Sequence, residues 1–134
     1  MYRHAAVAFL IAVSLAACGG VTDPSQNTQS PFSGTINPGV GNFQNWGFTV
    51  SKSGELSITV TTMTPVMPTS TYFEVGFGNS ISGSCQPLQT NQYAIVGAAA
   101  ISGYPVTPGA YCAFIIDEGL FTKAETYTMV VSHP

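Results

Sequence analysis

The sequence predicts an all-β protein, an antiparallel β-sandwich of jelly-roll type with roughly seven or eight strands. Three observations predict this class. Apolar and polar residues alternate with a period of two in most segments after residue 31. Turns rich in glycine and proline separate these segments, and residues 18–134 contain no amphipathic helical pattern. Short strands joined by such turns are typical of two packed sheets.

The first strands are expected at residues 32–36, 45–50 and 56–61. The last two flank a turn at residues 51–54, and each carries an apolar residue at every second position, so we expect a hairpin with one solvated face. The alternating apolar residues are Trp46, Phe48, Val50, Leu56, Ile58 and Val60.

The middle of the chain is expected to hold one strand between two loops. Residues 64–69 contain two prolines and are expected to be a loop or an edge crossing. Alternation returns in residues 72–77, which predicts a strand. Residues 78–91 are dense in Gly, Ser, Asn and Gln and contain Cys85, so we expect a long surface loop there.

The C-terminal part is expected to contribute three strands. Residues 93–100 predict a strand, although Gly97 and the alanines also permit a helical turn, and residues 102–109 are expected to be a connector rich in turns. The continuous apolar run 111–117 predicts a buried strand with side chains on both faces in the interior. Alternation in residues 125–132 predicts the last strand.

The N-terminus has the layout of an export signal. Arg3 provides a positive charge, and the uncharged apolar stretch 5–17 follows it. This stretch is shorter than the roughly 20 residues that a membrane-spanning helix needs. An ordinary secretory peptide, cut after residues 14–16 and leaving Cys18 free, is the alternative, and a retained transmembrane helix is a weaker one.

Residues Leu15-Ala16-Ala17-Cys18 resemble the lipobox of bacterial lipoproteins. The resemblance implies that residues 1–17 are a signal peptide and that Cys18 is lipidated and becomes the first mature residue. It also implies a membrane anchor in the cell envelope, with palmitate among the acyl chains. Several acyl chains hold a protein stably in a membrane, whereas a single chain holds it weakly. Gly19 follows the cysteine where an inner-membrane retention signal is typically Asp, which favours the outer membrane.

The composition sets the domain count and excludes one class of partner. Residues 18–30 lack large apolar side chains except Val21, so we expect a flexible tether, and residues 31–134 have the length of one domain. Only 7% of the chain is charged, and beyond Arg3 it has just Lys52 and Lys123 as basic residues. Proteins bind the phosphate backbone of nucleic acids mainly through Lys and Arg side chains. Because this chain has so few of them, we expect no nucleic-acid partner.

The remaining cysteines, Cys85 and Cys112, are expected to form a disulfide in an exported chain. A zinc site is the alternative, but His133 is the one histidine of the mature part, and two Cys with one His do not complete a tetrahedral shell.

The arrangement of several strand and turn motifs resembles the bacterial pre-peptidase C-terminal domain. The motifs are Trp46-x-Phe48-x-Val50, Gly54-x-Leu56-x-Ile58-x-Val60, Pro108-Gly109-x-Tyr111 and Tyr127-x-Met129-x-Val131. The resemblance would cover most of residues 31–133, but acidic residues frequent before the first and middle strands of that family are missing. It implies an accessory β-sandwich module without catalytic residues.

No motif for catalysis or for a cofactor is found in the sequence. A hydrolytic triad needs a base, and His133 lies at the C-terminus, where a frayed backbone rarely holds a catalytic geometry. The adjacent Asp117 and Glu118 are interpreted as a turn cap or a solvated edge. Their alternatives are a calcium site completed by loop carbonyls and a glycosidase pair. We expect no enzyme, no cofactor and no metal.

Exposed aromatic residues are the remaining candidates for ligand binding. Trp46 shares a face with core residues and is interpreted as core, whereas Tyr72 beside Glu74 and Tyr104 in an expected loop are candidate sugar-binding residues. We therefore expect a lipid-anchored, non-enzymatic envelope lipoprotein that displays a binding or structural module to an envelope protein or polysaccharide. A carbohydrate-binding module is the alternative.

Overall fold

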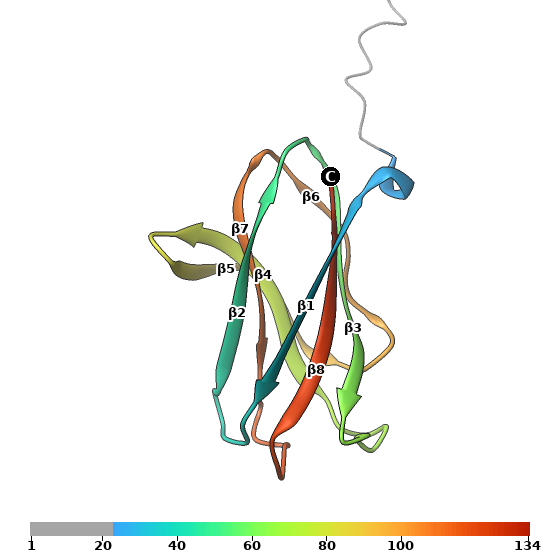
Figure 1. The fold of residues 1–134 in the computed structure, drawn as a ribbon, viewed down its shortest axis with the longest axis vertical. Coiled ribbons are helices and arrows are strands. Elements are labelled where there is room, and N and C mark those ends of the chain that lie inside the picture. The colour runs from blue at the N-terminus through green and yellow to red at the C-terminus, as the bar shows by residue number, and fades with distance from the viewer. Residues whose placement is uncertain (1–22) are drawn as a thin grey trace, which may run out of the picture.

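A computed structural model describes residues 23–134, which form two four-stranded sheets packed face to face (Figure 1). The expected signal peptide, Cys18 and the start of the expected tether lie outside the described residues. All strand pairs are antiparallel. A single turn of 3-10 helix, η1 (Pro24–Gln26), precedes the strands β1 (Thr28–Ile36), β2 (Phe43–Val50), β3 (Gly54–Thr64), β4 (Phe73–Ile81), β5 (Ser84–Ala94), β6 (Ala99–Val106), β7 (Gly109–Ile116) and β8 (Glu125–His133).

The strand order confirms the predicted jelly roll. One sheet runs β1-β8-β3-β6 and the other β2-β7-β4-β5, so successive strands alternate between the sheets except at the β4–β5 hairpin. The expected hairpin between residues 45–50 and 56–61 is therefore wrong, because β2 and β3 belong to opposite sheets. The apolar faces of β2 and β3 still meet in one core. The alternation of apolar residues is therefore the same whether the two strands pair in one sheet or lie in opposite sheets.

The core lies between the sheets and uses every second residue of the strands. Buried and more exposed positions alternate along β8 and along the first seven residues of β3, up to a register shift after Val60. Trp46 packs against this core as expected, with its ring edge-on to Tyr127 at a centroid distance of 5.6 Å. The largest fully buried side chains are Tyr127, Phe73, Phe77, Phe114, Ile36, Leu56, Ile58, Ile115 and Met129.

The sandwich begins earlier than the expected boundary at residue 31. Residues 28–30 pair with β8, and Asn27 donates hydrogen bonds from its side chain to the Glu55 carbonyl and to Ser132 Oγ. The polar residues 28–30 give no apolar alternation that would predict a strand. They can still pair, because an edge strand is held through its backbone N–H and C=O groups and needs few apolar side chains.

The expected loop 78–91 is wrong, because these residues complete β4 and form most of β5. The two strands make a hairpin whose turn, Ser82-Gly83, has positive φ at both residues. The edge strand β5 is polar and largely exposed, so it lacks the alternation that would have indicated a strand. Pro31, Pro87 and Pro105 all lie on edge strands, where proline is tolerated because every second N–H faces away from the partner strand.

The segments before and after residue 100 also differ from expectation. β5 ends at Ala94, Gly97 turns the chain with positive φ, and β6 occupies most of the expected connector 102–109. The Gly97 N–H donates to the Val60 carbonyl. β6 is an edge strand with glycine and proline inside it, and this composition resembles a turn in the sequence.

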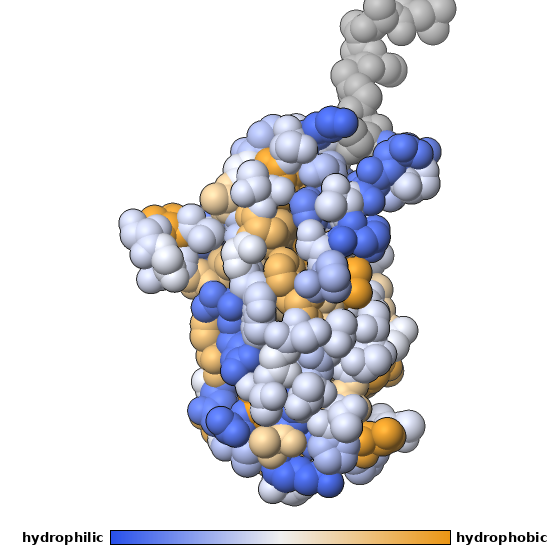
Figure 2. Space-filling model, viewed as in Figure 1, coloured by the Kyte–Doolittle hydropathy of each residue, from blue (hydrophilic) through white to orange (hydrophobic). Residues whose placement is uncertain are grey.

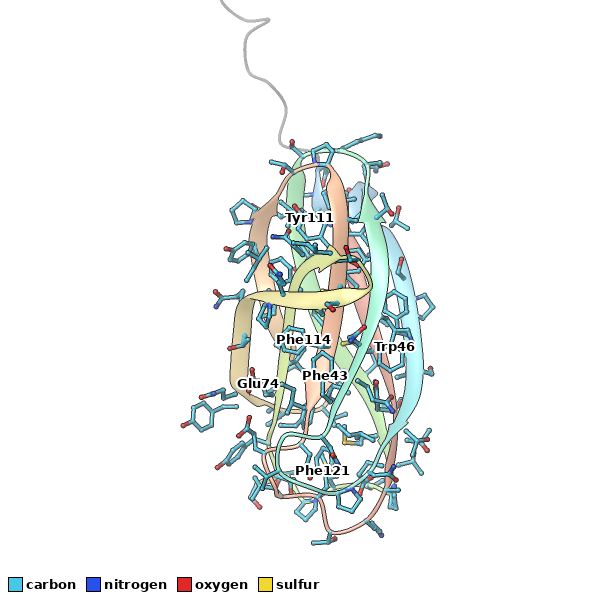
Figure 3. All side chains as sticks on the ribbon, turned by 90° about the vertical axis from the view of Figure 1, so that its left-hand side faces the viewer. Phe43, Trp46, Glu74, Tyr111, Phe114 and Phe121 are labelled. Carbon is cyan, nitrogen blue, oxygen red and sulfur yellow. A yellow bond between two sulfur atoms is a disulfide. The ribbon has the colours of Figure 1, made fainter. Side chains whose placement is uncertain are left out.

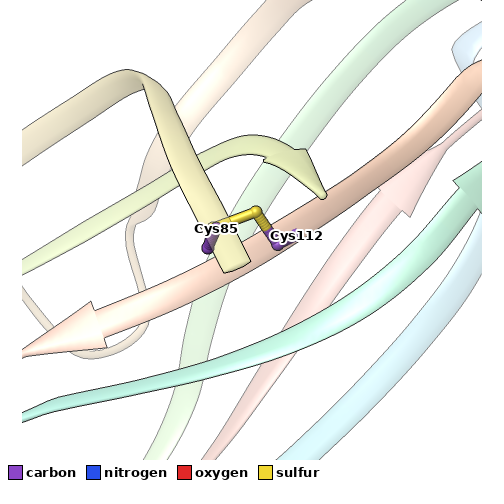
Figure 4. Close-up of a disulfide and its surroundings, with 2 residues drawn as sticks. All are labelled: Cys85 and Cys112. Carbon is purple, nitrogen blue, oxygen red and sulfur yellow. A yellow bond between two sulfur atoms is a disulfide. The ribbon is translucent and has the colours of Figure 1, made fainter. Parts of the chain in front are cut away.

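The disulfide expected between Cys85 and Cys112 is confirmed, so the zinc alternative is wrong. It joins β5 to β7 although β4 lies between them in the sheet (Figure 4). This geometry requires β5 to fold over the outer face of β4, and the hairpin crosses in front of the sheet in Figure 3. Closing a loop between residues 27 positions apart stabilises the fold by about 3–4 kcal/mol in the chain-entropy model.

Two glycines of β4 make this crossing possible. A Cβ atom at Gly78 would collide with the backbone of Gln86, and one at Gly76 would collide with the Gln89 carbonyl and the Phe114 ring. Phe114 points away from the core yet is fully buried, because it lies on the outer face that β5 covers.

Gly78→Ala is therefore expected to lower the free energy of unfolding by about 1–3 kcal/mol, since its new methyl group must displace the backbone of β5. Urea unfolding measures the change. The control is Gly47→Ala in β2, where the nearest atom to the new Cβ is the Tyr111 carbonyl oxygen at 3.9 Å. An equal effect of the two substitutions would contradict the crossing.

Candidate functional site

The loops of one end of the sandwich carry most of the exposed apolar side chains. This end, which we call the loop pole, consists of residues 37–42, 65–72, 95–98 and 117–124, and it lies opposite η1 and the C-terminus (Figure 1). Figure 2 shows apolar surface there, at the lower end of the view. The exposed side chains of the loop pole are Val40, Val66, Ile95, Val96 and Leu120, and Val66 is 92% exposed.

One cavity of the loop pole is lined by Asn37 and Asn42, and two further cavities there are neighbours of each other. The larger, which we call the Glu125 cavity, has a volume of about 230 Å³, and its apolar lining includes Val66, Met67, Leu120 and Phe121. The smaller, about 120 Å³, shares Met67, Pro68 and Thr71 with it and extends to Ile95 and Val96. Phe121, labelled near the lower end of Figure 3, is buried beside Phe73 and ties this end to the core.

Glu125 is the one carboxylate that lines the larger cavity. Its side chain is 4% exposed, and its Oε2 atom is buried without a hydrogen-bond partner among the described residues. Burial raises the pKa of this carboxyl above its ordinary value, and the positive charge of Lys123 offsets part of that rise. An unpaired buried polar group with a shifted pKa in a cavity is typical of a functional site.

Asp117 organises the loop pole through hydrogen bonds to two of its loops. Oδ1 accepts hydrogen bonds from the backbone N–H groups of Gly119, Leu120 and Phe121, and Oδ2 accepts one from Gly39. Both oxygens of this buried carboxylate thus accept hydrogen bonds from the protein itself, which confirms the interpretation of Asp117 as a turn cap. Its contacts connect two loops that are far apart in the sequence.

Among the sugar-binding candidates, Tyr72 has the more open setting. It pairs with Tyr93 at a centroid distance of 5.1 Å and an interplanar angle of 53°, and Tyr93 is 71% exposed. Glu74 lies close to Glu118, and burial together with this neighbour raises the pKa of Glu74. The two rings and the Glu74 group are joined through the neighbouring positions 72 and 74 and positions 92 and 93, and we call them together the tyrosine cluster: Tyr72, Tyr93, Glu74, Glu118 and Gln92.

Tyr104 lies elsewhere, within β6 and not in a loop. It is half-buried, and its ring is edge-on to Phe77 at 4.9 Å. The structure therefore does not bring Tyr104 together with Tyr72. Sequence reasoning missed Tyr93 as its companion, because the pairing depends on how β5 returns beside the start of β4.

His133 is ordered, so the expected frayed C-terminus is wrong. It is the last residue of β8, buried against the Phe48 ring, and its Nε2 atom lies 2.9 Å from Ser30 Oγ. Nδ1 has no hydrogen-bond partner among the described residues, so no carboxylate orients the imidazole as a catalytic triad requires. This Ser–His contact packs β1 against β8.

Neither a scan against protein-family models nor a search of curated proteins finds a match to this chain. Within residues 23–134 no helix is long and apolar enough to cross a membrane. The same part of the chain holds no group of three or more His, Cys, Asp or Glu residues placed to hold a metal ion. The candidate sites of the described domain are therefore the Glu125 cavity and the tyrosine cluster.

The raised pKa values predict how stability depends on pH. A carboxyl whose pKa is higher in the folded than in the unfolded protein binds its proton more tightly when folded. Its stabilising contribution is complete below the unfolded pKa, near 4.5, and is lost as the pH rises through the folded pKa. We expect Glu125→Gln to unfold with a smaller loss of stability between pH 4.5 and pH 7 than the wild type.

Urea unfolding at a series of pH values measures this difference. Glu55→Gln is the matched control, since it removes the same charge from β3, far from the loop pole. Identical pH dependence of the wild type and Glu125→Gln would contradict the assignment of a raised pKa to Glu125.

Proposed function

We propose that this protein is a lipid-anchored, non-enzymatic lipoprotein of the cell envelope, in the outer membrane of a host that has one, and that it displays a β-sandwich binding module. The observation that carries the proposal is the arrangement of the described domain around its N-terminal end. η1 and the start of β1 lie at one end of the sandwich, and the loop pole with its cavities lies at the other (Figure 1). An anchor at Cys18 would hold the first end toward the membrane and present the loop pole away from it.

The low charge of the chain suits this role. Only 7% of its residues are charged, and uncharged polar side chains cover most of the strands that face solvent. Two resemblances support the same proposal. The lipobox resemblance implies export and a membrane anchor, and the resemblance to the pre-peptidase C-terminal domain implies an accessory module without catalytic residues.

Lipidation at Cys18 predicts that Cys18→Ala abolishes incorporation of radiolabelled palmitate and releases the protein from the membrane fraction. Three acyl chains hold a protein in a bilayer at about 0.8 kcal/mol per buried methylene, so loss of all of them should leave no stable anchor. The double variant Cys85→Ala, Cys112→Ala is the control, because it removes the other two thiols and should keep the label. Persistent labelling of Cys18→Ala would contradict the proposal.

Carbohydrate binding by the module is the second candidate, and the tyrosine cluster supports it. Aromatic faces stack on sugar rings, and carboxyl and amide groups bind their hydroxyls. Tyr93 is the most exposed aromatic side chain of the described residues, and Glu74, which follows Tyr72 by two residues, interacts with Glu118 and Gln92.

Tyr93→Ala is expected to weaken retention on an envelope polysaccharide about fivefold or more in affinity electrophoresis, because an aromatic contact contributes about 1 kcal/mol or more. Tyr93→Phe preserves the ring and should retain the ligand. Tyr104→Phe should behave as the wild type. If Tyr93→Ala and the wild type were retained equally on every envelope polysaccharide that retains the wild type, the tyrosine cluster would be excluded as the carbohydrate-binding site.

A further inference from the structure

Glu125 borders the loop pole, and its Oε2 atom is a buried polar atom with no hydrogen-bond partner among the described residues. A buried carboxylate oxygen without a donor is costly, and natural proteins rarely leave one unless a ligand, ion or water completes it. The side chain is held at the first position of β8, opposite Ile36 of β1, so the strand pairing fixes its position. The fold therefore leaves this oxygen available to a donor from outside the chain.

The size of the cavity limits what can supply this donor. Its volume of about 230 Å³ is below the roughly 300–1,000 Å³ of pockets for drug-sized ligands. A single long side chain suits this space better than a whole organic ligand. The mouth lies among exposed apolar residues, Val66 at 92% and Leu120 at 41% exposure, which a partner's surface would cover.

The lining indicates the chemistry of that side chain. Apolar walls from Val66, Met67 and Phe121 suit an aliphatic stem, and one carboxylate suits a single positive charge at its tip. A lysine ammonium is a compact point charge on such a stem, whereas the five donors of an arginine fork would find too few acceptors. The excess of carboxylates over lysines in the domain also favours a basic partner.

We propose that the Glu125 cavity receives a lysine side chain from a protein partner, with its stem against Val66 and Met67 and its ammonium donating to Glu125. Lys123 lines the same cavity and is the competitor within the chain. It is exposed and no hydrogen bond joins it to Glu125 Oε2. The inference deepens the proposed function, because it names the chemistry of a partner for the displayed module.

The test uses the full-length chain purified from membranes in detergent, with methyl NMR signals of Val66, Met67 and Leu120 as the readout. The probe is Nα-acetyl-lysine N-methylamide, and Nα-acetyl-norleucine N-methylamide has a similar aliphatic stem but no charge. We expect saturable shifts with the lysine probe, about tenfold weaker binding of the norleucine probe, and about a tenfold loss in Glu125→Gln. Lys123→Met should strengthen binding, and Glu55→Gln should leave it unchanged.

Equal binding of both probes, or unchanged binding by Glu125→Gln, would overturn the inference. Lower stability of Lys123→Met without tighter binding would also overturn it, because Lys123 would then fill the cavity itself. Stronger Glu125-dependent binding of a glucosamine tetramer than of the lysine probe would assign the cavity to a cationic glycan instead. Failure of the lysine probe with palmitate labelling of Cys18 intact would leave the proposed function standing.

Discussion

The two sheets hold together because every second side chain of their strands is apolar and points into one shared layer. β7 and β8 are inner strands of their sheets. β8 pairs with β1 and β3, and β7 pairs with β2 and β4, so each inner strand connects two neighbouring strands by backbone hydrogen bonds. Phe73, Phe77 and Tyr127 are among the largest side chains fully buried in that layer. With charged residues at 7% of the chain, this burial, the backbone pairing and one disulfide carry the stability of the domain.

The shared core also determines where binding groups can lie. Loops of the jelly roll gather at the ends of the sandwich, and four of them form the loop pole. Asp117 fixes two of these loops by accepting four backbone hydrogen bonds, which leaves Glu125 as the neighbouring carboxylate with an unused oxygen. Two acidic residues eight positions apart thus have different roles, one satisfied by the fold and the other open to a partner.

The outer face of the β2-β7-β4-β5 sheet is occupied in a different way. β5 folds over Gly76 and Gly78, the disulfide joins it to β7, and Phe114 is buried beneath it with Phe43 beside it. The same strand returns Tyr93 to Tyr72. One hairpin therefore covers an apolar patch and builds the tyrosine cluster.

The sequence alone determined the fold class, the disulfide, the core position of Trp46 and the faces of β3, β7 and β8, because burial on one side of a strand requires alternation. Only the tertiary structure decided that β2 and β3 lie in opposite sheets, that the polar segments 28–30 and 84–91 are edge strands, and which tyrosines meet. Edge strands pair through backbone atoms and leave no apolar pattern. Pairs such as Tyr72 and Tyr93, or the isolation of Glu125, arise from contacts between distant segments, which no local pattern contains.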